Sequence, residues 1–221
     1  LNLKIKGGTD VLWSPTIDYT QHVLKEAYSR MGINFSFELI KRGYYPKGNG
    51  EIQLKIYPSN IKSITFSKRK TKNVKLICSF SKLTKEEIEN KVNEITKKLT
   101  GANYVVDVEI KSEDAIDSGA TLLIYSIDDC SIIGLDALYN KKIHEFNLDI
   151  GDFIKKYSMD DNLADMLVVL GSLCNDKIIF PVNQITKHLE TNLFVTSKIT
   201  GCKYGIGKTS NGFEVIIEGI S

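Results

Sequence analysis

Hydrophobic residues occupy every second position in several short stretches of the chain, a pattern typical of half-buried β-strands. The pattern is found at residues 1–5, 35–40, 51–57, 74–80, 104–110, 121–127, 131–138, 177–182, 202–208 and 213–218. Asn211-Gly212, between the last two stretches, predicts a hairpin turn there.

Hydrophobic residues three and four positions apart predict amphipathic helices between these strands. The clearest helix covers residues 84–99, because Thr84 and Glu87 match a capping box and Gly101 follows its end. Its inward face is predicted to hold Ile88, Val92, Ile95 and Leu99.

Four further helices are predicted outside this central part of the chain. One covers residues 19–31, with Asp18 as its N-cap and Gly32 at its end. The others cover residues 146–157, 158–173 and 189–200. Their predicted core positions are Tyr19, Val23, Leu24, Ala27, Tyr28, Met31, Leu163, Met166, Leu167, Leu170, Leu193, Phe194 and Ile199.

The order of these elements predicts an α+β fold with a main domain of repeated β-α-β-β units. Residues 1–57 form one such unit, and strands with helices of similar size return after His144. The middle of the chain is predicted to form a separate, compact unit. We therefore predict a main domain of residues 1–60 and 144–221, with a smaller α/β domain, residues 61–143, inserted into it.

The amino-acid composition indicates a globular protein but no particular function. The 221 residues are 42% hydrophobic and 25% charged, as in ordinary globular proteins, and the net charge of +2 does not by itself indicate nucleic acid. Four scattered cysteines without a C-x-x-C pair are predicted to be buried free thiols. No apolar run approaches the roughly 20 residues of a membrane span, and no signal-peptide pattern opens the chain, so a cytoplasmic protein is expected. Leu1 lies inside a predicted strand, and we expect a fragment that lacks an N-terminal portion.

The connection KRGYYPKGNGE, residues 41–51, has the most unusual chemistry in the chain. Arginine and lysine bind phosphate, tyrosine rings stack on bases, and glycine lets a backbone approach a ligand closely. The simpler alternative is a solvated, glycine-rich hairpin connection. The candidate binding residues are Arg42, Tyr44, Lys47, Gly48 and Gly50.

Among the three histidines, His188 is the strongest catalytic candidate, because it stands where a helix begins. A helix N-terminus suits a phosphate-bearing ligand. Asp161 and Asp165 lie one turn apart on the preceding helix, where Asp165 could accept from one imidazole nitrogen and leave the other free as a nucleophile. A structural histidine and a solvated acidic helix face remain as alternatives.

Several segments resemble the RNA 3'-terminal phosphate cyclase family, in its archaeal form. The loop at residues 41–51 resembles the signature RGYYPKGGGE, with Asn49 in place of one glycine. HLETN at residues 188–192 is similar to the motif around the family's nucleophilic histidine. DNLADMLV at residues 161–168 is similar to the preceding helix, and GGTDVLWSPTIDY at residues 7–19 is similar to a segment that packs about adenine.

The resemblance implies an enzyme that uses ATP and Mg²⁺ or Mn²⁺ to convert an RNA 3'-phosphate into a 2',3'-cyclic phosphate. His188 would form a covalent histidyl-AMP beside Asp165, and the adenylate would pass to the RNA before the 2'-hydroxyl closes the ring. The 41–51 loop would bind the substrate, with Lys62–Lys75 as a weaker candidate for the RNA backbone. The residues implied to bind the nucleotide are Pro15, Tyr19, Asp161, Asn162 and Met166.

The chain departs from the family pattern in ways that bear on the nucleotide. Asn162 stands where many members carry an aromatic residue that stacks on the base, and Met166 replaces a polar residue. Nothing in the chain matches the glycine-rich, Glu- and Arg-bearing segment with which family members open. No metal ligands and no oligomeric state are assigned.

Two other functions remain open at this point. The same fold occurs in non-catalytic, cyclase-like proteins of ribosome biogenesis, which lack the nucleophilic histidine, so the presence of His188 favours the enzyme. A carboxyvinyl-transferase-like enzyme is the more distant alternative, on fold analogy alone.

Overall fold

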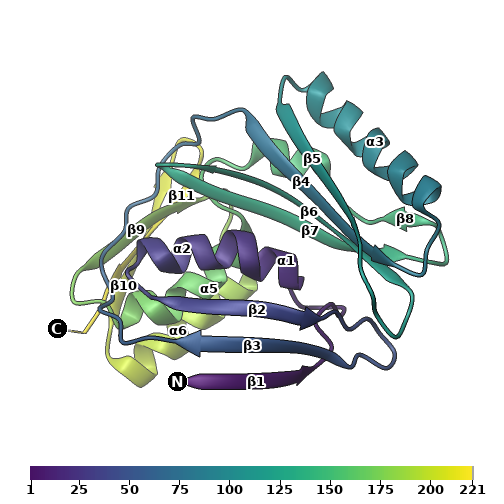
Figure 1. The fold of residues 1–221 in the computed structure, drawn as a ribbon. Helices are drawn as coiled ribbons and strands as arrows, with labels where there is room; N and C mark the ends of the chain where they lie inside the picture. Colours follow the sequence, from purple (N-terminus) through teal and green to yellow (C-terminus); the bar gives the residue numbers. More distant parts are fainter. Residues whose placement is uncertain (221) are drawn as a thin grey trace.

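Three β-sheets organise the fold in a computed structural model that describes residues 1–220 (Figure 1). The N-terminal sheet has the antiparallel order β1-β3-β2, and the C-terminal sheet has the antiparallel order β10-β11-β9. The middle sheet has the order β5-β4-β6-β7-β8, in which only the β4–β5 pair is parallel. The strands are β1 (Asn2–Gly7), β2 (Phe35–Lys41), β3 (Gly50–Ile56), β4 (Asn73–Ser81), β5 (Val105–Ser112), β6 (Gly119–Asp128), β7 (Ser131–Asn140), β8 (Glu145–Phe146), β9 (Lys177–Val182), β10 (Lys203–Thr209) and β11 (Gly212–Glu218).

The helices pack against these sheets and, with the strands, confirm the predicted α+β class. They are α1 (Ile17–Tyr19), the π-helical η1 (Thr20–Leu24), α2 (Lys25–Arg30), α3 (Lys85–Gly101), α4 (Ile150–Lys155), α5 (Asp161–Ser172) and α6 (Lys187–Thr200). Every predicted strand is present, and β9 has the predicted bounds. None of the helices within residues 1–220 is both long enough and apolar enough to cross a membrane.

One predicted helix cap is wrong, and one predicted capping box does not form. The first helix is capped by Thr16, whose hydroxyl accepts from the backbone N–H of Tyr19, while the predicted cap Asp18 is buried against Arg42. Thr84 is the N-cap residue of α3, as predicted, but its side chain makes no capping hydrogen bond. Glu87 turns away from that cap and contacts Tyr139 and His144 instead.

The predicted helix over residues 146–157 is shorter in the structure. Glu145 and Phe146 pair with β7 as strand β8, and α4 begins only after Asp149, which caps it by accepting from the N–H of Asp152. The next helix begins at Asp161 rather than at Ser158, because Asp160 is its N-cap.

The core face of α6 was predicted wrongly in part. Leu193 is buried as expected, but 54% of Phe194 and 79% of Ile199 are exposed. The residues of α6 that face inward are Leu189, Leu193 and Thr196, which follow a spacing of four and three. In α3, all four predicted core positions are buried.

The middle sheet separates two hydrophobic cores, which lie on its opposite faces (Figure 1). Adjacent residues of β6 illustrate the division, because Leu122 packs with α3 and α4 on the outer face and Leu123 packs with the first helix and α5 on the inner face. Phe66 also packs in the inner core, and Phe153 packs in the outer one. The cores therefore cross the positions at which we divided the chain into domains, and that division stays a prediction.

All four cysteines are free thiols. Cys78, Cys174 and Cys202 are buried as predicted, and Cys130 is partly exposed.

Candidate active site

His188 lies in the first turn of α6, which runs beside α5 (Figure 1). The cap of this helix is Thr186, whose hydroxyl accepts a 3.0 Å hydrogen bond from the N–H of Leu189. The first N–H groups of a helix have no partner within the helix, and they give its N-terminus a partial positive charge. The side chain of His188 is exposed. An imidazole is thus presented to solvent at a helix end that favours anions.

Asp165 lies on α5, close enough to His188 for the two charges to interact. Burial raises the pKa of the Asp165 carboxyl to about 6; the charge of His188 opposes this rise, and the charge of Asp161 adds to it. Its Oδ1 is buried and, within residues 1–220, has no hydrogen-bond partner. The structure therefore brings the two predicted catalytic residues together and leaves the carboxylate with an unused acceptor.

Asp161 connects the start of α5 to the loop that leads into α6. It accepts a 2.7 Å hydrogen bond from Lys156 Nζ and a 2.9 Å hydrogen bond from Gln184 Nε2. Asn162 is exposed and Met166 is half-buried on the same part of α5. Asp161, Asn162, Asp165 and Met166 thus all lie in the N-terminal half of α5, the helix that packs against α6.

Tyr19 is fully buried, and its hydroxyl donates a 2.7 Å hydrogen bond to Asp160 Oδ1. The same carboxylate accepts from the N–H of Leu163 at 2.9 Å and from the N–H of Gly134 at 2.7 Å. Burial raises the pKa of Asp160 to about 6. In this structure Tyr19 positions α5 and offers no open face to a base, while Pro15 remains half-buried at the surface.

Sequence reasoning missed Asp160, although a signal for it exists. An aspartate directly before a run of helical periodicity is a strong N-cap candidate. Because the helix was predicted to begin at Ser158, Asp160 fell inside the predicted first turn and was not considered as the N-cap.

Arg42 is buried, with only 2% of its surface exposed, and is surrounded by acidic side chains. Its guanidinium donates 3.0 Å hydrogen bonds to Asp10 and to Asp18, and it also donates to Glu113. Thr121 accepts a further hydrogen bond at 3.3 Å. In this structure Arg42 joins the N-terminal unit to the middle sheet, and its guanidinium donates to acceptors of the protein itself.

The acidic partners of Arg42 were also missed. Glu113 follows Arg42 by 71 residues, so no local pattern could have indicated the contact. Burial raises the pKa of Asp10, and the charge of Arg42 opposes that shift. A long-range ion pair of this kind follows only from the topology.

The glycines of the 41–51 loop allow it to pack against the loop after β1. A Cβ on Gly43 would lie 2.4 Å from Gly50 N, and one on Gly48 would lie 3.1 Å from Gly8 N. Gly48 has φ +65°, and Asn49, which replaces a family glycine, has φ 56°, a conformation that asparagine tolerates. The two candidate glycines Gly48 and Gly50 thus contact backbone in this structure.

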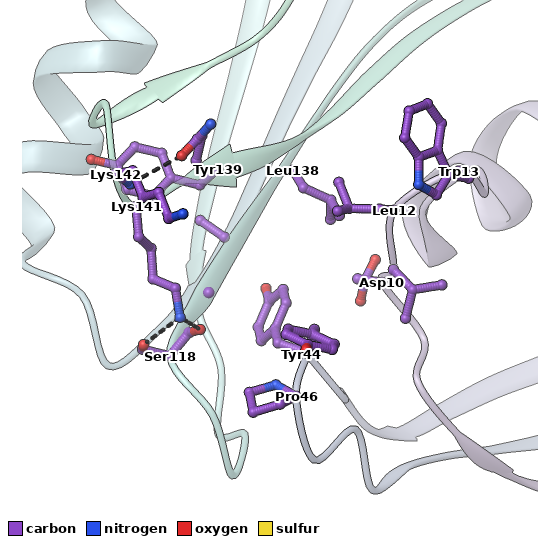
Figure 2. Close-up of a pocket in the computed structure, with 15 residues that line it drawn as sticks. Asp10, Leu12, Trp13, Tyr44, Pro46, Ser118, Leu138, Tyr139, Lys141 and Lys142 are labelled. Atoms are coloured by element: carbon purple, nitrogen blue, oxygen red, sulfur yellow. Dashed lines mark hydrogen bonds between the residues drawn. The ribbon is translucent and has the colours of Figure 1, made fainter.

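Tyr44 and Lys47 have different environments in the same loop. Tyr44 is buried, donates to the carbonyl of Ser79 at 3.2 Å and packs against Gly119. The side chain of Lys47 is exposed, and its backbone N–H donates to Asp117 at 2.9 Å. Of the predicted site residues, Tyr44 alone lines the cavity of about 850 Å³ shown in Figure 2.

The described residues contain no cluster of side chains that could coordinate a metal ion. Within residues 1–220, no group of three or more His, Cys, Asp or Glu side chains is arranged to hold an ion.

Comparison with known proteins identifies relatives along nearly the whole chain. A family profile described as RNA 3'-terminal phosphate cyclase matches residues 1–206. A protein of that name from Methanosarcina barkeri is 34% identical over 221 aligned positions, and the alignment covers 98% of this chain and 66% of that protein. Another from Methanococcoides burtonii is 28% identical, over 99% of this chain and 66% of its own length. The chain therefore spans about two thirds of the length of these relatives (66%).

Proposed function

Because the chain belongs to the RNA 3'-terminal phosphate cyclase family, we propose that it converts an RNA 3'-terminal phosphate into a 2',3'-cyclic phosphodiester with ATP. The observation that carries this proposal is the exposed imidazole of His188 in the first turn of α6, beside the carboxylate of Asp165. It supports the enzyme over a non-catalytic relative, because a binding protein has no need of a nucleophile in that position.

The first step is attack of a His188 ring nitrogen on the α-phosphorus of ATP. A P–N bond forms, the bond between the α-phosphorus and the bridging oxygen breaks, and pyrophosphate leaves. Neutral imidazole is a good nucleophile, and the phosphoramidate that it forms is a reactive donor. The N-terminus of α6 would stabilise the negative charge that develops on the phosphate oxygens.

Asp165 acts as a positioning residue in this scheme. The buried Oδ1 that has no partner within residues 1–220 would accept from the imidazole N–H opposite the attacking nitrogen. That contact would fix the orientation of the ring and stabilise the positive charge that it gains.

Two displacements complete the reaction. An oxygen of the RNA 3'-phosphate attacks the adenylate phosphorus, and His188 leaves, so that an RNA-adenylate anhydride forms. The vicinal 2'-hydroxyl then attacks the 3'-phosphorus, AMP leaves, and the cyclic phosphodiester closes.

The nucleotide would lie over the N-terminal half of α5. Asp161, Asn162 and Met166 line this part of the helix, and we assign Pro15 to the same ligand. Asn162 offers an amide in place of an aromatic ring, so base contact here would depend on hydrogen bonding more than on stacking. A divalent ion, Mg²⁺ or Mn²⁺, would offset the charge of the phosphates, which themselves supply ligands to such ions. Residues 1–220 provide no preformed metal site, and no step above depends on one.

On the substrate side, Lys47 is the exposed cation of the 41–51 loop and the residue that we assign to RNA phosphate. Arg42 is engaged by three carboxylates, so we assign it to holding the loop in place. Tyr44, Gly48 and Gly50 shape the loop by close packing.

The experiment is conversion of an RNA oligonucleotide with a 3'-phosphate, in the presence of ATP and Mg²⁺ or Mn²⁺. A cyclic product resists alkaline phosphatase, whereas the substrate is dephosphorylated. We expect product with the wild-type protein and none with His188→Asn. His144→Asn makes the same change at another exposed histidine, so it should retain activity. Absence of product from the wild-type protein, with RNA binding intact, would favour the non-catalytic alternative.

A further inference from the structure

The cavity of about 850 Å³ lies between the N-terminal unit and the middle sheet, and His188 and Asp165 are not among the residues that line it. Figure 2 shows Leu12 and Trp13 on one side, Lys141 on the other, and Tyr44 with Pro46 between them. Its size falls within the range of roughly 300–1,000 Å³ that is usual for ligand pockets. The cavity is therefore large enough for part of a polymer as well as for a small molecule.

Two of the aromatic side chains that line the cavity, Trp13 and Tyr45, are exposed. Trp13 is fully exposed and has φ 69°, a conformation that bulky side chains rarely adopt. Tyr45, which also lines the cavity, is 77% exposed. Strained backbone that presents an exposed ring is a feature of binding sites rather than of packing. Such rings are the surfaces on which unpaired bases stack.

The wall opposite Trp13 carries two lysines (Figure 2). Lys141 Nζ donates to the carbonyl and to the hydroxyl of Ser118, at 3.1 and 3.2 Å, which fixes the ammonium at the rim. The backbone N–H of Lys142 donates to Asn140 Oδ1 at 3.0 Å, which shapes the turn. Neither ammonium forms an ion pair within residues 1–220.

Among the described residues that line the cavity, no carboxylate neutralises the positive charge of Lys141 and Lys142. Asp10 is the one carboxylate among the lining residues, and it is paired with Arg42 at 3.0 Å. The lining is therefore positive in net charge beside uncovered rings. That combination complements a polyanion with aromatic bases, and it fits a protein partner less well because protein interfaces are depleted in lysine.

We propose that this cavity is a subsite for single-stranded RNA, in which a base stacks on Trp13 or Tyr45 and the adjoining phosphates contact Lys141 and Lys142. The inference rests on the proposed function, since it takes the polymer to be the RNA whose 3' end reacts near His188. It adds a binding site for nucleotides away from the reacting phosphate.

Trp13 is the single tryptophan of the chain, so its fluorescence reports on this cavity directly. The protein is titrated, without ATP, with a single-stranded RNA oligonucleotide that carries a 3'-phosphate, and binding is followed in parallel by anisotropy of a label on the RNA. We expect tryptophan emission to fall along the binding curve. Inorganic polyphosphate, which has the charge but no bases, should leave the emission unchanged. Saturating RNA without a change in emission, or equal quenching by polyphosphate, would overturn the proposal.

Variants test the two walls separately. Trp13→Ala should weaken RNA binding roughly 5- to 150-fold, the effect of losing one stacked base, and Trp13→Phe should recover part of it. Replacing Lys141 and Lys142 together by alanine should make the slope of the log binding constant against log salt concentration less steep by about 1.4. Each phosphate contact on a single strand contributes about 0.7 to the steepness of that slope. The matched control replaces Lys97 and Lys98, an exposed pair on α3, and should leave the slope unchanged.

Failure of this subsite and failure of the proposed function are distinguishable. Tryptophan quenching by RNA without any covalent AMP on the protein would contradict the proposed function alone. Covalent AMP on the wild-type protein without quenching by bound RNA would contradict the subsite alone.

Discussion

The hydroxyl of Tyr19 donates a 2.7 Å hydrogen bond to Asp160, and this contact joins the first helix of the chain to the residue that caps α5. The other oxygen of Asp160 accepts from Gly134 on β7. One buried carboxylate thus holds together elements from three separate parts of the sequence. Because α5 carries Asp165, the position of the proposed catalytic pair depends on this contact.

Tyr19→Phe should therefore lower stability. The substitution keeps the ring and removes one donor from a buried carboxylate, which costs about 1–3 kcal/mol. The free energy of unfolding in urea measures the effect. Tyr28→Phe is the control, because the hydroxyl of Tyr28 makes only a long, 3.4 Å contact at a half-buried site and should contribute less than about 1 kcal/mol. Equal losses in the two variants would contradict the role assigned to Asp160.

The ionisation of Asp160 should make stability depend on pH. Burial raises its pKa in the folded protein to about 6, whereas an aspartate in the unfolded chain has a pKa of about 3.9. Between these values the folded chain keeps a proton that the unfolded chain has lost, so the contribution of Asp160 to the free energy of unfolding falls as pH rises.

The measurement compares wild type with Asp160→Asn at several pH values. The stability of the wild type relative to the variant should be greatest below about pH 4, should decline between about pH 4 and pH 6, and should be constant above about pH 7. Other titrating groups are common to both proteins and cancel. A difference that is flat or increases over this interval would show that the carboxyl is not held in its neutral form.

Arg42→Ala should be among the most damaging single substitutions. It would leave Asp10 and Asp18, both buried, without their cation, and breaking a buried pair in this way costs about 3–5 kcal/mol. Lys85→Ala removes one partner of an exposed ion pair on α3 and should cost no more than about 0.5 kcal/mol. Thermal or urea unfolding of the two variants checks the contrast, and a small loss for Arg42→Ala would mean that the guanidinium is free for a ligand.

Gly43→Ala should disrupt the 41–51 loop, because the added Cβ would lie 2.4 Å from Gly50 N, where backbone cannot easily move away. We expect a loss of stability of at least about 1 kcal/mol, typical of overpacking. Gly101→Ala, at the end of α3, meets nothing within 4 Å and should be neutral or slightly stabilising. Comparable unfolding midpoints for the two variants would indicate that the close approach of the loops is not needed.

Local patterns predicted much of the fold. Strand β9 and the final hairpin were found because alternation and an Asn-Gly pair are local signals, and the core face of α3 was found because its apolar stripe is uninterrupted. The face of α6 was less predictable. Its apolar residues surround the helix, and only tertiary packing selects Leu189 and Leu193 over Phe194 and Ile199.

In the candidate site, too, some contacts could be suggested from the sequence and others depend on the tertiary structure. The sequence suggested a pairing of His188 with Asp165, because the two residues lie near the starts of two successive helices. Asp18 and Arg42 could not be paired in this way, because their contact depends on how the first helix meets the middle sheet. Arg42 has a structural role because it is buried, and the local sequence does not indicate that burial.

The central claim is that His188 carries AMP, and covalent labelling with α-labelled ATP and a divalent ion tests it most directly. The account predicts that the wild-type protein takes up label that is released by acid and that disappears when RNA with a 3'-phosphate is added. It also predicts no label on His188→Asn and normal labelling of His144→Asn. A wild-type protein that stays unlabelled, or label that persists on His188→Asn, would contradict the account.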